Sequence, residues 1–597
     1  MSSLKIREFF PGLLILPCVL ALSACGDSDG ESTDTDDSTT SSTTAASDMT
    51  TAGPTGDGDG DGDGDGDGDG DGDGDGDGDG DGDGDGDGDS DVDLPQPDEL
   101  VAEGGVVSGT IEVLYADNQL LIHSENEEYT TRDIYTRTYN GGLPGPTLRM
   151  QAGDMIDLEF INNLPEHSDA NEPIANHNLP HRINSTNFHT HGLHVNPTGP
   201  GDNVIREIVP QSTDAIVIDI PQNHNPGTHW YHGHKHGANA VQFYSGMTGF
   251  LIVEGDVDEV PEIAAAQERL LMFQEIGLDA SGEVPDPNPN AMAPPQIFAF
   301  DETYLAINGV VNPIIRMRPG EVQRWRLGNG TLGDFLNLEL EGHDLHQIAI
   351  DGVTFDSVRQ IQSFNMAPGN RTDLLIKAGE AGTYHLTAPL AAAPMMPPED
   401  VVLATIVVEG EPMDMALPTD LPTPDYILPD TTGETPDDTR TTTFTVEPGI
   451  NGFKIDGESF QHGCVNHVLQ RGDLIEWTVN NMSMIPHPFH IHTNAFQVIE
   501  RNNQALNPPE WRDVIEVPGN GSITFRMRID DFVGQIVLHC HIITHEDLGM
   551  MQNVVMVDDT IPEMDKVSDP GVDPDDPAQA NPDVPGYYVS ENFNLCN

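Results

Sequence analysis

The distribution of apolar residues along the chain predicts a body built from short strands. Between residues 100 and 560, alternating or β-branched runs recur between Gly, Pro, Asn and Asp turns. Examples are "MIDLEFI", "AIVIDI", "FLIVEG", "VQRWRL", "TYHLTA", "ATIVVEG", "LIEWTV" and "SITFRMRI". Helical periodicity is rare, and we expect only a short helix around 260–271. Regularly spaced strands predict an all-β fold of sandwiches rather than a parallel sheet.

An internal repeat divides this body into three units. Each copy contains a strand, a Gly-Asp or Gly-Glu turn and an alternating strand, at residues 143–162, 312–329 and 467–481. An apolar strand closes each unit, at residues 249–254, 404–409 and 554–557. Three copies over about 460 residues correspond to three β-sandwich domains of ordinary size.

The N-terminal segment indicates export. Lys5 and Arg7 precede a mostly apolar run that ends in "LSAC", which is too short for a confident membrane span. "LSAC" is similar to the bacterial lipoprotein cleavage box, so we expect Cys25 to carry a lipid anchor. An ordinary cleaved signal peptide is the alternative. The protein is therefore expected in the bacterial cell envelope, in the periplasm or at the cell surface.

The next segment is predicted to be a disordered acidic linker. Ser/Thr-rich sequence and then alternating Asp-Gly offer almost no apolar side chains to offset the entropy of ordering. Strict Asp-Gly alternation differs from the nine-residue repeat of calcium-binding β-helices, which disfavours calcium binding. The net charge of −77 argues against nucleic acid and anionic membranes as partners. Membrane contact is expected only through Cys25.

These features predict seven consecutive segments, with a Pro-rich linker between the second and third sandwiches. They are a signal peptide (1–24), the acidic linker (25–100), sandwich domains at 101–255 and 256–412, the second linker (413–440), a third sandwich (441–560) and a C-terminal tail (561–597). The sequence leaves the oligomeric state open, with a monomer among the options.

Four groups of histidines in the first and third units predict a metal cluster. They are His189 and His191; His232 and His234; His487, His490 and His492; and His539 and His541, followed by His545. Residues i and i+2 of a strand point to one face, so each H-x-H pair presents two imidazoles together. Eight such ligands are too many for one ion. The middle unit has no H-x-H pair, so we expect the cluster between the first and third units.

Cys540 predicts a second metal site beside that cluster. It lies between two histidines, and on an extended segment its side chain points away from theirs. With His487, His545 and a distant axial Met550, it would form the His₂Cys arrangement of blue-copper electron-transfer sites. Zinc is disfavoured, because mixed Cys/His zinc sites use tighter spacings and at most four ligands.

The remaining cysteines permit one disulfide. Cys18 would leave with the signal peptide, so only Cys464 and Cys596 are available to pair, in an oxidising compartment. The sequence does not show whether they meet.

These motifs resemble those of the multicopper oxidases, specifically the three-domain laccase-like members. The resemblance covers about residues 105–558 and includes "YNGGLPGPTLRMQAGD", "SGMTGFLIVEG", "APGNRTDLLI" and "WRDVI". It implies three consecutive cupredoxin-like Greek-key β-sandwiches and four copper ions. The type 1 copper would be bound by His487, Cys540, His545 and Met550, and the type 2 copper by His189 and His490. The type 3 pair would be bound by His191, His232, His234, His492, His539 and His541.

The resemblance also implies two proton-relay acids. Glu546 matches the acid proposed to supply protons to oxygen in bacterial members. Asp202 resembles a second such acid, although "NPTGPGDN" is offset from the commonest spacing. Reduction of O₂ to water consumes four protons, so the chemistry requires an acid with access to the cluster.

The expected function is one-electron oxidation of phenolic or aromatic amine donors, coupled to four-electron reduction of O₂ to water. A metallo-oxidase acting on Cu⁺, Fe²⁺ or Mn²⁺, with a role in metal homeostasis, is the alternative. Met395, Met396, Met413 and Met415 are too few to decide between them. A nitrite reductase would lack the eight cluster histidines, and a non-enzymatic copper-binding lipoprotein would not need Cys540 as a relay.

Overall fold

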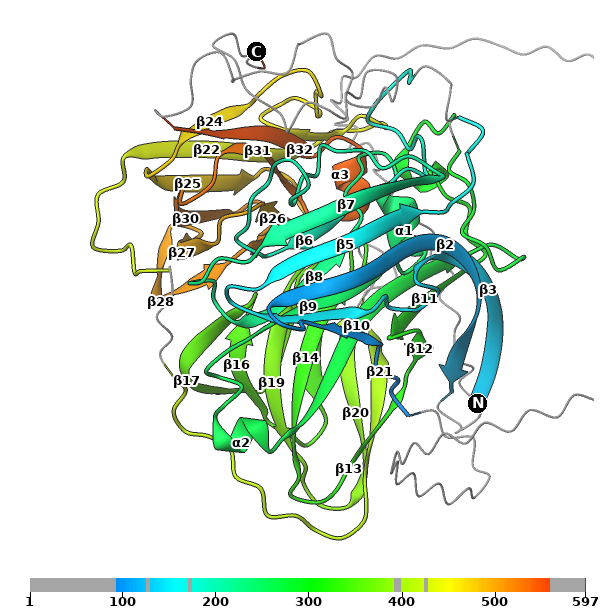
Figure 1. Ribbon diagram of the computed structural model, residues 1–597, viewed down its shortest axis with the longest axis vertical. Helices are drawn as coiled ribbons and strands as arrows, with labels where there is room; N and C mark the ends of the chain where they lie inside the picture. Colours follow the sequence, from blue (N-terminus) through cyan, green and yellow to red (C-terminus); the bar gives the residue numbers. More distant parts are fainter. Residues whose placement is uncertain are drawn as a thin grey trace, which may run out of the picture. The chain divides into compact units, whose positions relative to one another are not determined.

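The computed structural model describes residues 93–124, 129–169, 174–288, 290–390, 399–422, 428–558 and Cys596. The expected signal peptide, the anchor at Cys25, most of the acidic linker, Met395, Met396 and the tail before Cys596 lie outside the described residues. Strands dominate the described part of the chain, which confirms the predicted all-β class (Figure 1). No helix in this part is long and apolar enough to cross a membrane.

The first unit contains strands β1 to β9. One sheet has the order β1-β4-β9-β8-β6. Its strands are β1 (Glu99–Val101), β4 (Thr147–Gln151), β9 (Thr248–Glu254), β8 (Gly227–His232) and β6 (His189–His191). The facing layer contains β2 (Val106–His123), β3 (Tyr129–Tyr139), β5 (Met155–Asn162) and β7 (Ser212–Asp219). Leu148 and Leu251 of the first sheet share a buried core with Ile156 and Phe160 of the second layer, as expected of a sandwich.

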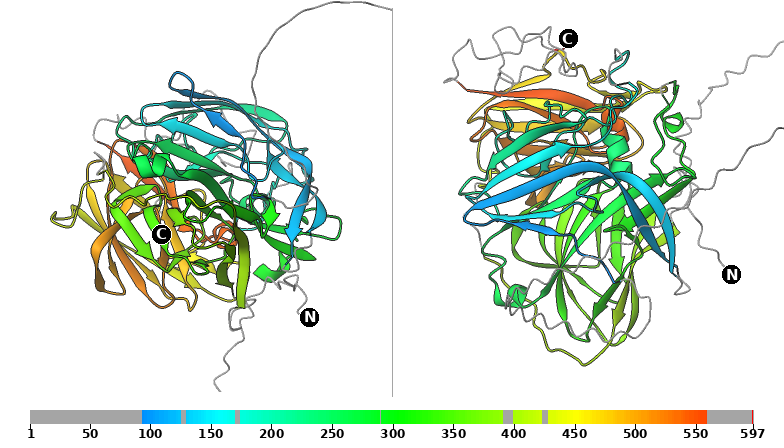
Figure 2. Two further views of the ribbon diagram at one scale, coloured as in Figure 1. Left: turned by 90° about the horizontal axis from the view of Figure 1, so that it is seen from below. Right: turned by 45° about the vertical axis from the view of Figure 1, so that its right-hand side comes forward.

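The first and second units share one continuous eleven-stranded sheet. The far end of β2 pairs with β12, with Leu121 opposite Val310. The β2–β3 ribbon is blue and strongly curved in Figures 1 and 2. The second-unit members are β10 (Gln267–Leu278), β11 (Glu302–Ile307), β12 (Val310–Val311), β14 (Val322–Gly330), β16 (Leu345–Ile350), β17 (Val353–Ile361) and β19 (Arg371–Lys377). The opposing sheet contains β13 (Ile314–Met317), β21 (Glu399–Val408), β20 (Gly382–Leu390), β15 (Leu336–Leu340) and β18 (Ser363–Met366).

The third unit is a sandwich of a six-stranded and a five-stranded sheet. The first contains β23 (Phe453–Ile455), β22 (Asp438–Val446), β25 (Leu474–Asn481), β30 (Ser522–Arg528), β27 (Phe496–Arg501) and β28 (Gln504–Arg512). The second contains β24 (His467–Gln470), β32 (Met551–Val557), β31 (Gly534–Cys540), β26 (His487–Ile491) and β29 (Val514–Val517). Trp477, Phe489 and Phe525 fill the space between them.

The predicted repeat is confirmed as a repeated strand pairing. In each unit the strand before the turn lies parallel to the closing strand: β4 with β9, β13 with β21, and β24 with β32. The turn glycines Gly153, Gly320 and Gly472 all have positive φ, of 92°, 78° and 98°. Only glycine adopts that conformation without steric cost, which explains its recurrence in all three copies.

The expected helix around 260–271 is largely wrong. Helix α2 (Pro261–Ala264) is short, and β10 begins at Gln267. The segment is rich in helix-forming residues, but β10 pairs in parallel with β14 and buries Leu270–Phe273, so tertiary pairing overrides local propensity. The other helices are α1 (Asn239–Tyr244), α3 (Ile543–Asp547) and the 3₁₀ turn η1 (Pro294–Gln296).

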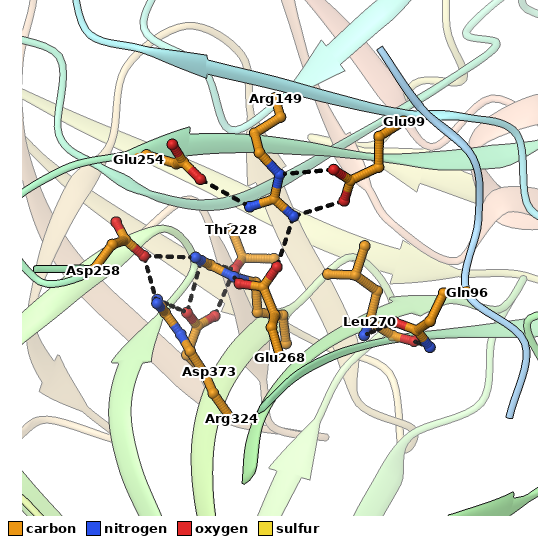
Figure 3. A network of polar contacts seen from close by, with 11 residues as sticks. Gln96, Glu99, Arg149, Thr228, Glu254, Asp258, Glu268, Leu270, Arg324 and Asp373 are labelled. Atoms are coloured by element: carbon orange, nitrogen blue, oxygen red, sulfur yellow. Dashed lines mark hydrogen bonds and ion pairs between the residues drawn. The ribbon is translucent and has the colours of Figure 1, made fainter. Parts of the chain in front are cut away.

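A buried ion-pair network joins the first two units (Figure 3). Arg149 of β4 lies 2.6 Å from Glu268 of β10, and Glu268 accepts a 2.5 Å hydrogen bond from Arg326. Arg326 also donates to Asp373 and to the hydroxyl of Thr228 in β8. Charge pairing offsets the desolvation of these groups, so the network orients β8 more than it adds net stability.

The structure answers the question about the cysteines, because Cys464 and Cys596 form a disulfide. The bond joins residues 132 positions apart and therefore closes a loop that includes most of the third unit. Removing it with a Cys464→Ser, Cys596→Ser double variant is expected to lower the free energy of unfolding by about 3–5 kcal/mol, because the unfolded chain gains conformational freedom. Thermal denaturation at matched copper loading measures this loss. An unchanged melting temperature would contradict it.

Candidate metal centres

Sheet register brings the histidine pairs together within each unit. In the first unit, β6 pairs antiparallel with β8 and sets His189 opposite His232. In the third unit, β26 pairs antiparallel with β31 and sets His490 opposite His539. All eight histidines of the predicted cluster are buried, at 2% exposure or less.

The two units meet at these histidines, as the sequence predicted. Their ligand atoms form three groups, each within 4.8 Å: His191, His232 and His541; His234, His492 and His539; and His189, His191 and His490. His541 Nε2 lies 3.2 Å from His191 Nδ1, and His234 Nε2 lies 3.2 Å from His539 Nε2. Every group therefore draws on both units. The middle unit supplies no member of these groups.

The hydrogen bonds of the histidines leave the inward nitrogens available to metal ions. Nδ1 of His490 donates to the Asp513 carbonyl at 2.8 Å, and Nδ1 of His232 donates to the Gly233 carbonyl at 2.8 Å. A carbonyl only accepts, so the opposite Nε2 carries a lone pair. Within the described residues, Nε2 of both histidines has no hydrogen-bond partner. Such buried orphans are costly, and bound metal ions would satisfy them.

Burial also sets the protonation states that metal binding requires. It lowers the pKa of His232 to about 3 and the pKa of His234 to about 4, so both imidazoles are neutral near pH 7. Burial raises the pKa of the Cys540 thiol. A metal ion at Cys540 must therefore displace a proton, which couples metal binding to pH. The donor set and its protonation states thus fit copper.

A separate group surrounds Cys540. Its sulfur lies 3.3 Å from His487 Nδ1 and 3.7 Å from His545 Nδ1. His487 and Cys540 are buried, whereas His545 is partly exposed. The fully buried Met550 accepts a 3.0 Å hydrogen bond from the Cys540 amide through its carbonyl. As predicted, Cys540 faces this group while the histidines on either side of it belong to the larger cluster.

Two buried carboxylates contact the cluster histidines. Glu546 in α3 lies 3.1 Å from His539 Nδ1 and 3.6 Å from His234 Nδ1. Burial would raise the pKa of Glu546, but the neighbouring imidazoles hold that pKa at about 2. Asp202 contacts His189 Nδ1 at 2.9 Å and accepts the Thr190 amide. These contacts orient His189, and the proton-relay role of Asp202 stays a prediction.

Four further residues contact these groups without having been assigned a role from the sequence. Asn239 donates to Glu546 at 2.5 Å, and the Ser483 hydroxyl lies 2.9 Å from His487 Nε2. Asp513 and Arg371 lie behind the His189, His191 and His490 group. The last two belong to the accessory signatures "WRDVI" and "APGNRTDLLI", so a signal for them was present. Asn239 and Ser483 have no comparable sequence signal.

Comparisons with known proteins agree with this arrangement. Three family models, each described as multicopper oxidase, match residues 123–171 with 174–258, 283–412 and 428–560. "Multicopper oxidase mco" of Staphylococcus haemolyticus is 25% identical over 450 residues, covering 72% of this chain and 86% of the relative. The laccase of Bacillus subtilis is 24% identical over 475 residues, covering 70% and 90%.

The solved structures add the fold. A multicopper oxidase from Campylobacter jejuni, described as a metallo-oxidase, superposes with a TM-score of 0.61 at 23% identity, covering 78% of this chain and 98% of that one. This likeness confirms three cupredoxin-like sandwiches. The family models together match well over half of the 597 residues. The chain belongs to the multicopper oxidases, copper-dependent oxidoreductases that use four copper ions to pass electrons from a reducing substrate to O₂.

Proposed function

We propose that the residues grouped in the metal centres hold the four coppers in the following way. His487, Cys540 and His545 bind the type 1 ion with Met550 as axial ligand, and His189 and His490 bind the type 2 ion. The type 3 pair is bound by His191, His232 and His541 on one side and by His234, His492 and His539 on the other. The clustering of ligand atoms in separate groups of three carries this assignment. When bound, the coppers accept electrons singly and deliver four to O₂.

The chain itself connects the two kinds of centre. Cys540 is bonded through the main chain to His539 and His541, which belong to different type 3 groups. Its thiolate therefore lies at the branch point of two short covalent paths. Glu546 contacts a type 3 histidine from each of two units and lies where a proton can be handed toward bound oxygen. Asp202 holds His189 and is the second proton-relay acid of this proposal.

We propose that the electron donors are phenols and aromatic amines. His545 is the partly exposed ligand of the type 1 group, and the ring of Phe453 stacks on it with a centroid separation of 4.0 Å. Electrons from a flat aromatic donor would enter at this edge. Oxygen uptake by the copper-loaded protein, measured against phenols, aromatic amines, Cu⁺, Fe²⁺ and Mn²⁺, tests the proposal. Rapid metal-ion oxidation with negligible phenol turnover would overturn it.

One observation favours Cu⁺ oxidation as a second candidate. Met482 and Met484 are the most exposed methionines near the type 1 group, at 68% and 88%. They flank Ser483, whose hydroxyl contacts His487. Thioethers are soft ligands that select Cu⁺, and two of them two residues from one another could deliver it beside this ligand.

A Met482→Leu, Met484→Leu double variant tests this second candidate. We expect KM for Cu⁺ to rise about tenfold, equivalent to roughly 1.4 kcal/mol of lost binding, while KM for phenols stays the same. Met292→Leu is the matched control, because Met292 is 75% exposed and belongs to the loop that precedes η1. Equal Cu⁺ kinetics in the wild type and the double variant would remove Cu⁺ binding by these residues.

We further propose that the protein is exported and anchored through a lipid on Cys25. The Cys464–Cys596 disulfide supports an oxidising compartment. Growth of a bacterial host with labelled palmitate is expected to label the wild type and not a Cys25→Ala variant. Equal labelling of both would rule out this anchor.

A further inference from the structure

A single side chain of the middle unit connects both halves of the cluster. Arg371, the first residue of β19, is fully buried. Its Nη1 and Nη2 donate to the two carboxylate oxygens of Asp513, each at 2.6 Å, in the bidentate geometry typical of strong Arg–carboxylate pairs. Its Nε donates to the Thr228 carbonyl in β8 at 3.2 Å. Arg371 thus joins the strand that ends in His232 to a residue of the third unit.

Asp513 in turn contacts two histidines of one group. Its carbonyl accepts the Nδ1 hydrogen of His490 at 2.8 Å, and its Oδ1 lies 3.4 Å from His191 Nε2. The His191 and His490 rings stack with centroids 3.9 Å apart and an interplanar angle of 7°. One residue therefore lies behind an imidazole from each unit.

The surroundings of the Arg371–Asp513 pair leave it little freedom. A Cβ at Gly192 would collide with Arg371 Nη2 and Asp513 Oδ2, so the glycine after His191 makes room for the pair. Asp351 accepts the Arg371 amide at 3.0 Å. The hydroxyl of Thr228 is held from the other side by the network of Figure 3, through Arg326. The guanidinium is therefore fixed on all of its faces.

We propose that Arg371 and Asp513 are positioning residues for the type 2 copper; this rests on the ligand assignment under the proposed function. Arg371 fixes the Asp513 carboxylate and thereby the direction of the Asp513 carbonyl. That carbonyl keeps the hydrogen of His490 on Nδ1 and the lone pair on Nε2, which faces the cluster. The middle unit, which supplies no ligand, thus sets the geometry of a site between the other two.

Arg371→Lys tests this role, because lysine keeps the charge but cannot make the bidentate contact. Residues that orient a metal ligand typically change metal affinity by about 10–100-fold. We expect the variant to lose its type 2 EPR signal at a correspondingly lower chelator concentration. Copper per protein should fall from four toward three. The blue absorption per protein should stay at the wild-type value, since the type 1 group does not contact Arg371.

Two further variants keep the test decisive. Arg324→Lys is the matched control, because Arg324 is a buried arginine of the same unit paired with Asp258 and Asp373 and does not contact Asp513. It should retain type 2 copper even if its melting temperature falls. Asp513→Asn keeps the carbonyl and weakens the pair, so it replaces Arg371→Lys should that variant not fold. Combining the two changes should cost no more copper affinity than the worse single change.

The outcomes separate this inference from the ligand assignment. A wild type without both a blue absorption and a type 2 signal would overturn the assignment itself. A normal wild type with an Arg371→Lys variant that holds type 2 copper equally tightly would overturn only the positioning role. Equal loss in Arg324→Lys would also overturn it, because the effect would then be general destabilisation.

Discussion

Replacing Cys540 with serine is expected to abolish the blue absorption and to lower oxidase activity by about 10³-fold or more, equivalent to roughly 4 kcal/mol of barrier. A hydroxyl is a harder and much weaker acid than a thiol, so it does not replace the soft thiolate that creates the blue-copper spectrum. The side chain that connects the type 1 group to the two type 3 groups is lost at the same time. Optical spectra, copper content and oxygen uptake measure the three consequences.

The matched control is the Cys464→Ser, Cys596→Ser variant, which removes the disulfide and leaves the buried Cys540 untouched. It should be less stable and remain blue. Copper content of the Cys540→Ser variant should approach three per protein, because the histidine groups of the cluster are intact. A Cys540→Ser protein that kept its blue absorption would refute the type 1 assignment.

Replacing Glu546 with glutamine is expected to slow reoxidation by O₂ about 10²–10⁴-fold, the usual contribution of a positioned proton-transfer group. Glutamine preserves the shape and can still accept from Asn239, but it cannot carry the proton. Reduction of the type 1 site by a donor should proceed at the wild-type rate, because Glu546 faces His234 and His539 rather than His545. Stopped-flow measurement of bleaching without O₂ and of recolouring with O₂ separates the two steps.

Asp547→Asn provides the control for Glu546→Gln. Asp547 is the next residue of α3 and is equally buried, but it accepts hydrogen bonds from the amides of Gly237 and Ala240 instead of contacting a cluster histidine. Its loss should lower the melting temperature while leaving recolouring by O₂ unchanged. Equal slowing of recolouring in both variants would count against a specific proton-transfer role for Glu546.

Most of the fold was predictable because its signals are local. Strands such as β5, β14 and β25 alternate apolar and polar residues or carry β-branched runs, and the Gly-Asp turns mark the same position in each unit. The failure at 267–271 has a physical reason. Ala and Glu favour a helix there, but the pairing of β10 with β14 and β11 is decided by residues distant in the sequence.

The cluster histidines were predictable because two imidazoles on one strand face carry their spacing in the sequence. The residues that orient them were harder to predict. Asp513 holds His490 through a main-chain carbonyl, which every residue type possesses, so its identity does not announce that contact. Ser483 and Asn239 are brought to His487 and Glu546 by tertiary packing. The pairing of Cys464 with Cys596 likewise depended on where the chain end returns.

The shared eleven-stranded sheet limits how this enzyme can be rebuilt from parts. The pairing of β2 with β12 runs through the boundary at which a chimera of two laccase-like proteins would ordinarily be cut. A first unit expressed without the second would present the end of β2 as an unpaired edge, a known template for aggregation. Grafts between relatives should therefore exchange the first two units as one block, and place the junction in the linker that precedes β22 (Asp438–Val446).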